Sequence, residues 1–289
     1  MDKIIEITNP KIFADTECEI AENPLWDEKN HLLYWRGNKG DLYRKKTDDP
    51  NAKIESVFLP EVIGGFVFGK NDDELILLGA KGKIIHYIWG GCVREIAVVP
   101  GACDGTLIND VIAAPDGSIY FGILTDYFFE KEKQNGKPGS LWQLTPAGSL
   151  RCLESDAGKI PNGMAFSPDG KKYYFAVTDH NCIYEYSYPS MSGKRKFVSS
   201  GYPPDGITID HDGRLWVADC AQNIYCYASD GTLLKRYFFP GIWGITSVAI
   251  GEKLYFTSMN HSYAEGFPMG KVYELPIDST FIPEFRVIF

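Results

Sequence analysis

A repeat of about 43 residues constrains the fold of this chain more than any other feature. Six similar units each consist of an apolar run, a polar turn and a second apolar run, as in GMAFSPDGKKYYFA from Gly163 and GITIDHDGRLWVAD from Gly206. Val, Ile, Tyr, Phe and Trp in the runs favour strands, and Asp-Gly in the turns favours hairpins. Successive turn residues are 42, 44, 53, 43 and 40 positions apart, at Asn30, Asp72, Asp116, Asp169, Asp212 and Glu252.

Repeats of 40–50 residues with about four strands are typical of β-propellers. We therefore predict an all-β, six-bladed β-propeller that forms a single domain over residues 1–289. Helical periodicity is weak throughout, which disfavours a Rossmann or α/β-barrel fold. The long third interval contains a charged insertion at 125–140, which we expect to form a loop over one end of the disc. Either the N-terminal IIEIT or the C-terminal FRVIF could complete a blade and close the ring.

Composition narrows the range of partners and compartments. The net charge of −9 makes electrostatically driven nucleic-acid binding improbable, and no apolar run is long enough to suggest a membrane span. The N-terminus lacks the apolar core of a secretory signal. Seven cysteines, an odd number without a CxxC pair, argue against a disulfide framework and for a reducing compartment. We expect a cytoplasmic protein with a small-molecule substrate, whose oligomeric state the sequence leaves open.

Polar residues recur at one position of the repeat. The first strand of each blade lines the channel of a propeller, so the residues just before these strands should converge at one mouth. Seven or eight residues before four of the turn residues stand Glu22, Asn109, Asn162 and Asp205. Asn and Asp before Gly are also common turn formers, but their matching phase, together with a Glu that forms turns poorly, favours a shared site.

Two carboxylates and two amide oxygens suit a hard divalent cation. We predict one such ion, with calcium favoured and magnesium, manganese or zinc as alternatives. Zinc fits less well because no His occupies the ring. We expect Asp110, beside Asn109, to support the backbone or to orient the metal ligands without binding the metal itself.

In four motifs, the chain resembles the gluconolactonase, regucalcin and senescence marker protein family of six-bladed propellers. The matching motifs are AENPLWDEKNHLLYW, IND at 108–110, IPNGMAFSPDG at 160–170 and PPDGITIDHDGRLWVA at 203–218. The resemblance implies that Glu22, Asn162 and Asp205 bind the metal, that Asn109 contacts metal or substrate, and that Asp205 is the catalytic carboxylate.

The chain departs from this family at three positions. Family members that act on sugar lactones carry an Arg where this chain has Leu107, and an acidic residue near the position of Tyr127. Leu107 and Tyr127 would instead offer apolar contacts to a substrate. Asn23 replaces a Gly of the first motif. These changes weaken the expectation of a sugar acid lactone but leave the predicted metal ligands intact.

Three functions therefore remain open. The first is a metal-dependent hydrolase of a lactone, in which the cation acts as a Lewis acid and Asp205 acts as a base or a nucleophile. The second is an organophosphate hydrolase on the same metal site. The third is a non-catalytic calcium-binding propeller.

Overall fold

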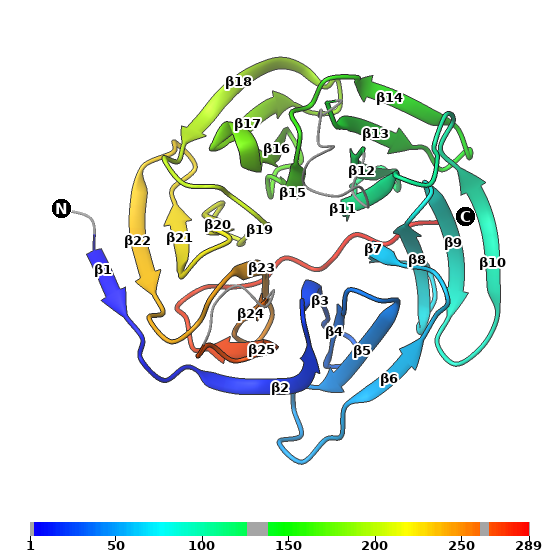
Figure 1. The fold of residues 1–289 in the computed structure, drawn as a ribbon. Helices are drawn as coiled ribbons and strands as arrows, with labels where there is room; N and C mark the ends of the chain where they lie inside the picture. Colours follow the sequence, from blue (N-terminus) through cyan, green and yellow to red (C-terminus); the bar gives the residue numbers. More distant parts are fainter. Residues whose placement is uncertain (1–2, 126–137, 261–265, 289) are drawn as a thin grey trace.

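The fold is a ring of six antiparallel sheets, as the repeat predicts. A computed structural model describes residues 3–125, 138–260 and 266–288, and the sheets follow one another around a central channel in Figure 1. The prediction of a six-bladed β-propeller is confirmed. The described residues contain no α-helix, and their one 3-10 turn is Thr178–His180. None of their helical segments has the length and apolar character needed to cross a membrane.

Each blade contributes its strands in order from the channel outwards. The innermost strands are β3 (Glu22–Asp27), β7 (Ile63–Phe68), β11 (Leu107–Ala113), β15 (Pro161–Phe166), β19 (Ile207–Ile209) and β23 (Ile245–Ile250). The second strands are β4 (Leu32–Arg36), β8 (Glu74–Gly79), β12 (Ile119–Leu124), β16 (Lys172–Val177), β20 (Leu215–Ala218) and β24 (Leu254–Ser258). Because the first and second strands run antiparallel, each pair forms the hairpin seen in the sequence repeat.

The outer half of the first five blades is a second hairpin, and in the sixth blade it is a pair of strands from opposite ends of the chain. The third strands are β5 (Asp41–Lys46), β9 (Lys83–Ile88), β13 (Ser140–Leu144), β17 (Cys182–Ser187), β21 (Asn223–Tyr227) and β25 (Gly270–Leu275). The outermost strands are β6 (Glu55–Phe58), β10 (Val93–Val98), β14 (Leu150–Glu154), β18 (Ser192–Ser199), β22 (Leu233–Phe238) and β2 (Lys11–Cys18).

The ring is closed by a segment that the sequence did not single out. The strand β2 pairs antiparallel with β25 and completes the sixth blade from the other end of the chain. The IIEIT segment instead lies in and just after β1 (Lys3–Glu6), which pairs in parallel with β22 as a fifth strand. The expectation that IIEIT or FRVIF completes a blade is therefore wrong.

The inner hairpins turn in a similar way in three blades. In blade four the amide of Ser167 donates to the carbonyl of Lys172 at 3.0 Å, and Gly170 donates back to Ser167 at 2.8 Å. Gly170 has φ +64°, a conformation that favours glycine. The PDG turn at Gly117 and the HDG turn at Gly213 have the same glycine hydrogen bond, and their first amide donates to the residue four positions on, one fewer than in blade four.

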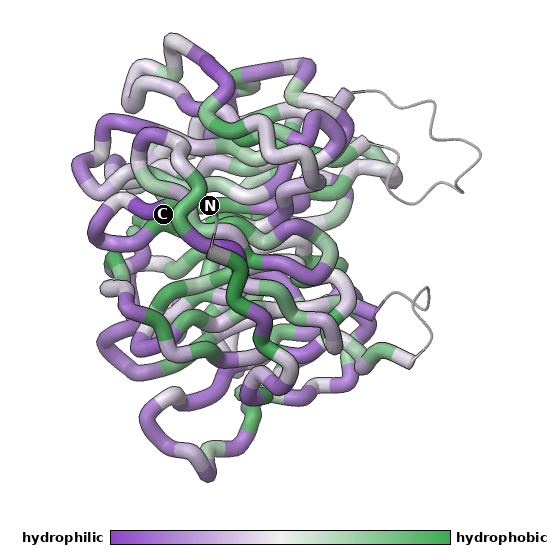
Figure 2. Tube along the Cα trace, turned by 90° about the vertical axis from the view of Figure 1, so that its left-hand side faces the viewer, coloured by the Kyte–Doolittle hydropathy of each residue, from purple (hydrophilic) through white to green (hydrophobic). Residues whose placement is uncertain are grey.

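The hydrophobic core is divided among the contacts between blades. One cluster of buried side chains lies between each pair of neighbouring blades, for example Tyr34 and Phe66 between blades one and two. In the side view, hydrophilic residues concentrate in turns at the edge of the disc and hydrophobic stretches lie inside it (Figure 2). Each blade is thus packed on two sides, which fixes the inner strands around the channel.

The C-terminal segment after β25 crosses the disc, as the red trace in Figure 1 shows. Phe281 packs edge-on against Trp26, with ring centroids 4.6 Å apart. Arg286 binds Asp27 at 3.0 Å, and the amide of Val287 donates to the carbonyl of Phe68. Asp27 is the last residue of β3 and Glu22 is the first, so this segment lies at the end of the channel opposite Glu22.

Candidate active site

Breaks in strand pairing mark the start of the innermost strands. The register shifts between Glu22 and Leu25 in β3, between Ile108 and Val111 in β11, and between Pro161 and Met164 in β15. Similar shifts occur in β7 and β23. A bulge changes the direction in which side chains point. Glu22, Asn109 and Asn162 all lie at these bulges, and the repeat therefore places them at one end of the channel.

Glu22 opens β3 beside a strained residue. Asn23 has φ +51°, and its side-chain oxygen accepts a hydrogen bond of 2.5 Å from the amide of Phe66 in the next blade. A left-handed conformation explains how Asn can stand where the resembling family has Gly. Burial, followed by repulsion from Asp110, raises the pKa of Glu22 to about 7, although the charge of Arg36 acts in the opposite direction.

Asn109 and Asn162 are in direct contact. The Nδ2 atom of Asn109 donates to the carbonyl of Pro161 at 3.1 Å and to Oδ1 of Asn162 at 3.4 Å. Asn162, which is 8% exposed, donates from Nδ2 to Thr178 Oγ1 at 3.0 Å, and Thr178 donates to the carbonyl of Pro204. These bonds hold both amide groups in place and leave the Oδ1 atom of Asn109 available to a ligand.

Asp205 lies in the same network. It is 5% exposed, and its amide donates to the carbonyl of Ala218 at 2.9 Å. Burial, then repulsion from Glu22 and Asp110, raises the pKa of its carboxyl group well above the usual value. Hydrogen bonds from the Cys220 thiol and the Asn162 amide act in the opposite direction. The structure thus brings together all four residues that share the repeat position.

Asp110, Arg36 and Cys220 are additional members of this site. Asp110 accepts a hydrogen bond from the amide of Val111 at 2.7 Å, as expected of a residue that supports the backbone. Burial raises its pKa to about 6, and its charge also acts on Glu22 and Asp205. Arg36 is the last residue of β4 and Cys220 lies two residues after β20. Neither stands at the repeat position before an innermost strand, from which the site residues were predicted.

Besides Asn109, two residues were predicted to contact substrate, and the structure describes one of them. Leu107 is 3% exposed and packs with Val62, Ala80 and Leu124 in a small cluster between blades two and three. Its contact with a substrate stays a prediction. Tyr127 lies outside the described residues, as does most of the 125–140 insertion.

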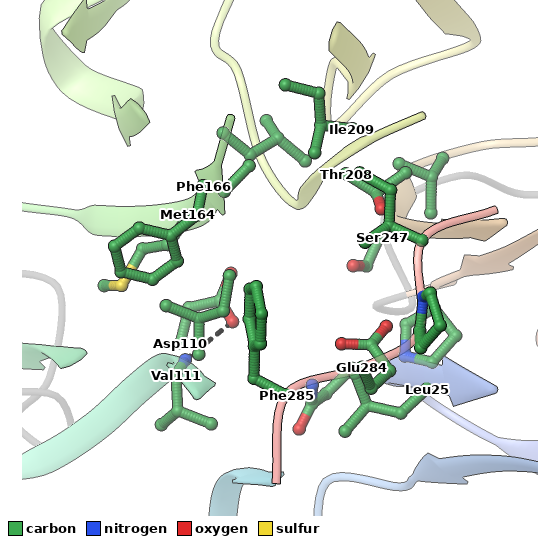
Figure 3. A pocket seen from close by; sticks show the side chains of 18 residues that line it. Leu25, Asp110, Val111, Met164, Phe166, Thr208, Ile209, Ser247, Glu284 and Phe285 are labelled. Carbon is green, nitrogen blue, oxygen red and sulfur yellow. Dashed lines mark hydrogen bonds between the residues drawn. The ribbon is translucent and has the colours of Figure 1, made fainter. Parts of the chain in front are cut away.

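A cavity of about 80 Å³ occupies the channel, with space for a few water molecules. Figure 3 shows Asp110 on one side of it and Glu284, Thr208 and Ser247 on the other. Glu284 belongs to the C-terminal segment, and burial raises its pKa to about 7. The cavity therefore extends from Asp110 to the segment that crosses the opposite end, and Glu22, Asn109, Asn162 and Asp205 do not line it.

The donor set at the mouth fits a divalent cation. Asp205 is buried, Glu22 and Asp110 are partly buried, and the three carboxyl groups repel one another. Carboxylates withdrawn from water are costly unless a positive charge lies among them. In the described ranges, no group of three or more His, Cys, Asp or Glu is arranged as a metal site. The candidate ligands are instead mixed, because amide oxygens of Asn109 and Asn162 complete the set, and such oxygens are ordinary calcium ligands.

Comparison with known proteins agrees with this architecture. The chain is 29% identical to a pentonolactonase of Haloferax volcanii over 94% of this chain and 96% of that protein. It is 26% identical to an L-arabinolactonase of Azospirillum brasilense, covering 89% and 87% of the two chains. The crystal structure of a regucalcin from Agrobacterium tumefaciens, described as a calcium-binding protein, superposes with a TM-score of 0.87 at 20% identity over 99% of both chains. That likeness shows the shared fold.

The family model for the SMP-30/gluconolactonase/LRE-like region matches residues 20–260, which include all six innermost strands and the four residues of the repeat position. The chain belongs to the SMP-30/gluconolactonase/LRE-like family.

Proposed function

We propose that the protein is a divalent-cation-dependent hydrolase that opens lactones to hydroxy acids. Membership of a family whose relatives include a pentonolactonase and an L-arabinolactonase supports lactone hydrolysis. The observation that carries the proposal is the meeting of Glu22, Asn162 and Asp205, from three different blades, at one mouth of the channel. Glu22 raises the pKa of Asp205, and Asp110 raises the pKa of both. Carboxyl groups that repel one another in this way are suited to a cation and poorly suited to a purely structural role.

Glu22, Asn162 and Asp205 would hold the cation, with Asn109 oriented towards it or towards the substrate. When bound, the ion would act as a Lewis acid on the lactone carbonyl. Calcium is favoured because all the donors are oxygens and two of them are amides, with magnesium, manganese and zinc as alternatives. The hydrogen bonds from Asn162 to Thr178 and from Thr178 to Pro204 keep the Asn162 amide oriented.

Asp205 carries the chemistry in this proposal, in one of two roles. As a general base it takes a proton from a water molecule whose oxygen attacks the carbonyl carbon. The ring C–O bond then breaks, and the proton passes to the ring oxygen as it becomes a hydroxyl group. As a nucleophile it attacks the carbonyl carbon itself, the ring C–O bond breaks, and the ring oxygen takes a proton from water to become a hydroxyl group. Water then hydrolyses the resulting acyl–Asp205 anhydride and regenerates the carboxylate. Burial beside the Cys220 thiol is compatible with both roles.

A panel of lactones tests the proposal. Protein treated with EDTA should be inactive on every member, and calcium should restore turnover of at least one sugar lactone. Single-turnover reactions in ¹⁸O-labelled water would then distinguish a general base from a nucleophile. Only a nucleophilic Asp205 can give a product whose new oxygen comes from the protein. Absence of cation-dependent turnover on the whole panel would contradict the proposal.

A further inference from the structure

Arg36 lies at the candidate site, and neither the repeat nor the family motifs assigned it a role. It is the last residue of β4 and pairs with Glu22 across the first hairpin of blade one. The residue is 8% exposed. Arginine is rarely buried to this extent unless it is paired with an acid.

The Arg36 guanidinium is nevertheless not held by an acid. Its Nη1 atom donates to the carbonyl of Gly37 at 3.2 Å, and its Nε atom is buried without a hydrogen-bond partner. Among the described residues, no carboxylate oxygen lies within 4.0 Å of its nitrogen atoms. A buried N–H without a partner is costly, so an additional acceptor at this position would be stabilising.

The positive charge of Arg36 acts on the mouth of the channel. The pKa values of Glu22 in blade one and Asp110 in blade three are raised by burial, and the charge of Arg36 acts against this rise. Blade two, between them, has glycines at the equivalent position, and a Cβ atom on Gly64 would overlap the carbonyl of Ile108. None of the residues at the repeat position is basic, so Arg36 supplies the positive side chain of this acidic group.

We infer that Arg36 is a substrate-binding residue whose free Nε edge binds a carboxylate on the lactone, remote from the ester that is hydrolysed. This inference rests on the proposed lactonase function and narrows its substrates to lactones of dicarboxylic sugar acids. The Nε and Nη2 donors on one edge of a guanidinium match the two oxygens of a carboxylate. A divalent cation and Arg36 together cancel the charges of Glu22, Asp110 and Asp205, so a further anion can enter without net repulsion.

Two lactones of similar size test this inference in the calcium-loaded protein. Glucaro-1,4-lactone carries a free carboxylate and galactono-1,4-lactone does not. We expect R36M to lower kcat/KM for glucaro-1,4-lactone about 10- to 100-fold more than kcat/KM for galactono-1,4-lactone, with the additional loss mainly in KM, because the loss of its charge beside Glu22 and Asp110 affects both substrates alike. R36K keeps the positive charge but lacks the paired Nε and Nη2 donors, and should give an intermediate loss of kcat/KM for glucaro-1,4-lactone. R195M, which changes an exposed arginine of the outer strand β18, is the matched control.

A binding measurement keeps the inference separate from the proposed activity. By calorimetry, the wild type should bind the dicarboxylate glucarate about 10-fold more tightly than galactonate, and R36M or R36K should reduce this preference. If no lactone is hydrolysed but this preference is present, the proposed function fails and the subsite stands. Equal losses on both lactones, or equal binding of both acids by the wild type, would overturn the inference. R36K serves for both measurements if R36M does not fold.

Discussion

At the scale of single residues, the site depends on carboxyl groups that the fold holds in unfavourable surroundings. Asp205 is nearly inaccessible to solvent and lies within the influence of Glu22 and Asp110. Hydrogen bonds from the Cys220 thiol and the Asn162 amide partly offset this repulsion. The arrangement is costly in the protein alone and becomes favourable when a cation is bound, since the ionised forms are then stabilised.

Replacing Asp205 with asparagine should separate catalysis from cation binding. D205N keeps a carbonyl oxygen for the ion but can neither accept a proton nor act as an efficient nucleophile. We expect kcat to fall by about 10²- to 10⁴-fold, while calorimetry still detects calcium binding. D212N, in the exposed turn of the same blade, should keep wild-type activity. Unchanged turnover in D205N would exclude Asp205 as the catalytic group.

The raised pKa of Glu22 predicts how stability depends on pH. In EDTA, the folded protein favours protonated Glu22, because the pKa of its carboxyl group is about 7 in the fold against an ordinary value of 4.5. The stabilisation of the fold by protonated Glu22 is fully present below pH 4.5 and is lost as the pH rises through about 7. E22Q removes it, so the free energy of unfolding of the wild type should fall relative to E22Q by about 1–3 kcal/mol between pH 5 and pH 8.

Chemical denaturation of both proteins at several pH values checks this expectation. Added calcium should reverse the trend in the wild type, because ion binding requires the ionised carboxylate and strengthens as the pH rises. Parallel stability profiles for the wild type and E22Q in EDTA would show that Glu22 is not perturbed by the fold.

At the scale of elements, the bulges and the C-terminal segment set the position of the site. The bulges at the start of β3, β11 and β15 interrupt pairing where the ligand side chains are needed. The C-terminal segment joins blades one and two through Asp27 and Phe68 at the other end of the channel. The inner strands are therefore held at both ends.

The ion pair between Arg286 and Asp27 tests the role of the C-terminal segment. Asp27 is buried, and Arg286 also stacks over Phe68 at 4.9 Å. R286M leaves the Asp27 carboxylate with only its bonds to Lys29 and Asn30, and should lower the free energy of unfolding by about 1–3 kcal/mol. R195M, whose partner Glu185 keeps Lys172, should change it by less than about 0.5 kcal/mol. Equal effects of both changes would argue against an anchored segment.

Elements with local signals were predictable from the sequence, and elements with distant partners were not. The inner hairpins were found because alternating apolar residues and Asp-Gly turns lie within about fourteen residues of each other. The strand β2 was not predicted from the sequence because it pairs with β25 from the opposite end of the chain and has only two buried side chains. Arg36 and Cys220 were not predicted because Arg36 ends a second strand and Cys220 follows one, whereas the prediction used the position before each innermost strand.

At the scale of the whole molecule, ring symmetry converts a sequence period into a site. Glu22, Asn109, Asn162 and Asp205 span most of the chain, yet contacts and electrostatic interactions link them at one mouth. The phase of the repeat predicted this convergence because every blade starts at the same distance from the channel axis. It could not predict the electrostatic surroundings, which depend on how Asp110 and Arg36 enter from their own strands.

Crystals grown with calcium, measured at a wavelength where calcium scatters anomalously, test the central claim most directly. The account predicts one strong peak at the channel mouth, with oxygens of Glu22, Asn162 and Asp205 within about 2.3–2.6 Å of it, and its loss in E22Q crystals. A peak elsewhere in the molecule, or none at this mouth at saturating calcium, would contradict the account.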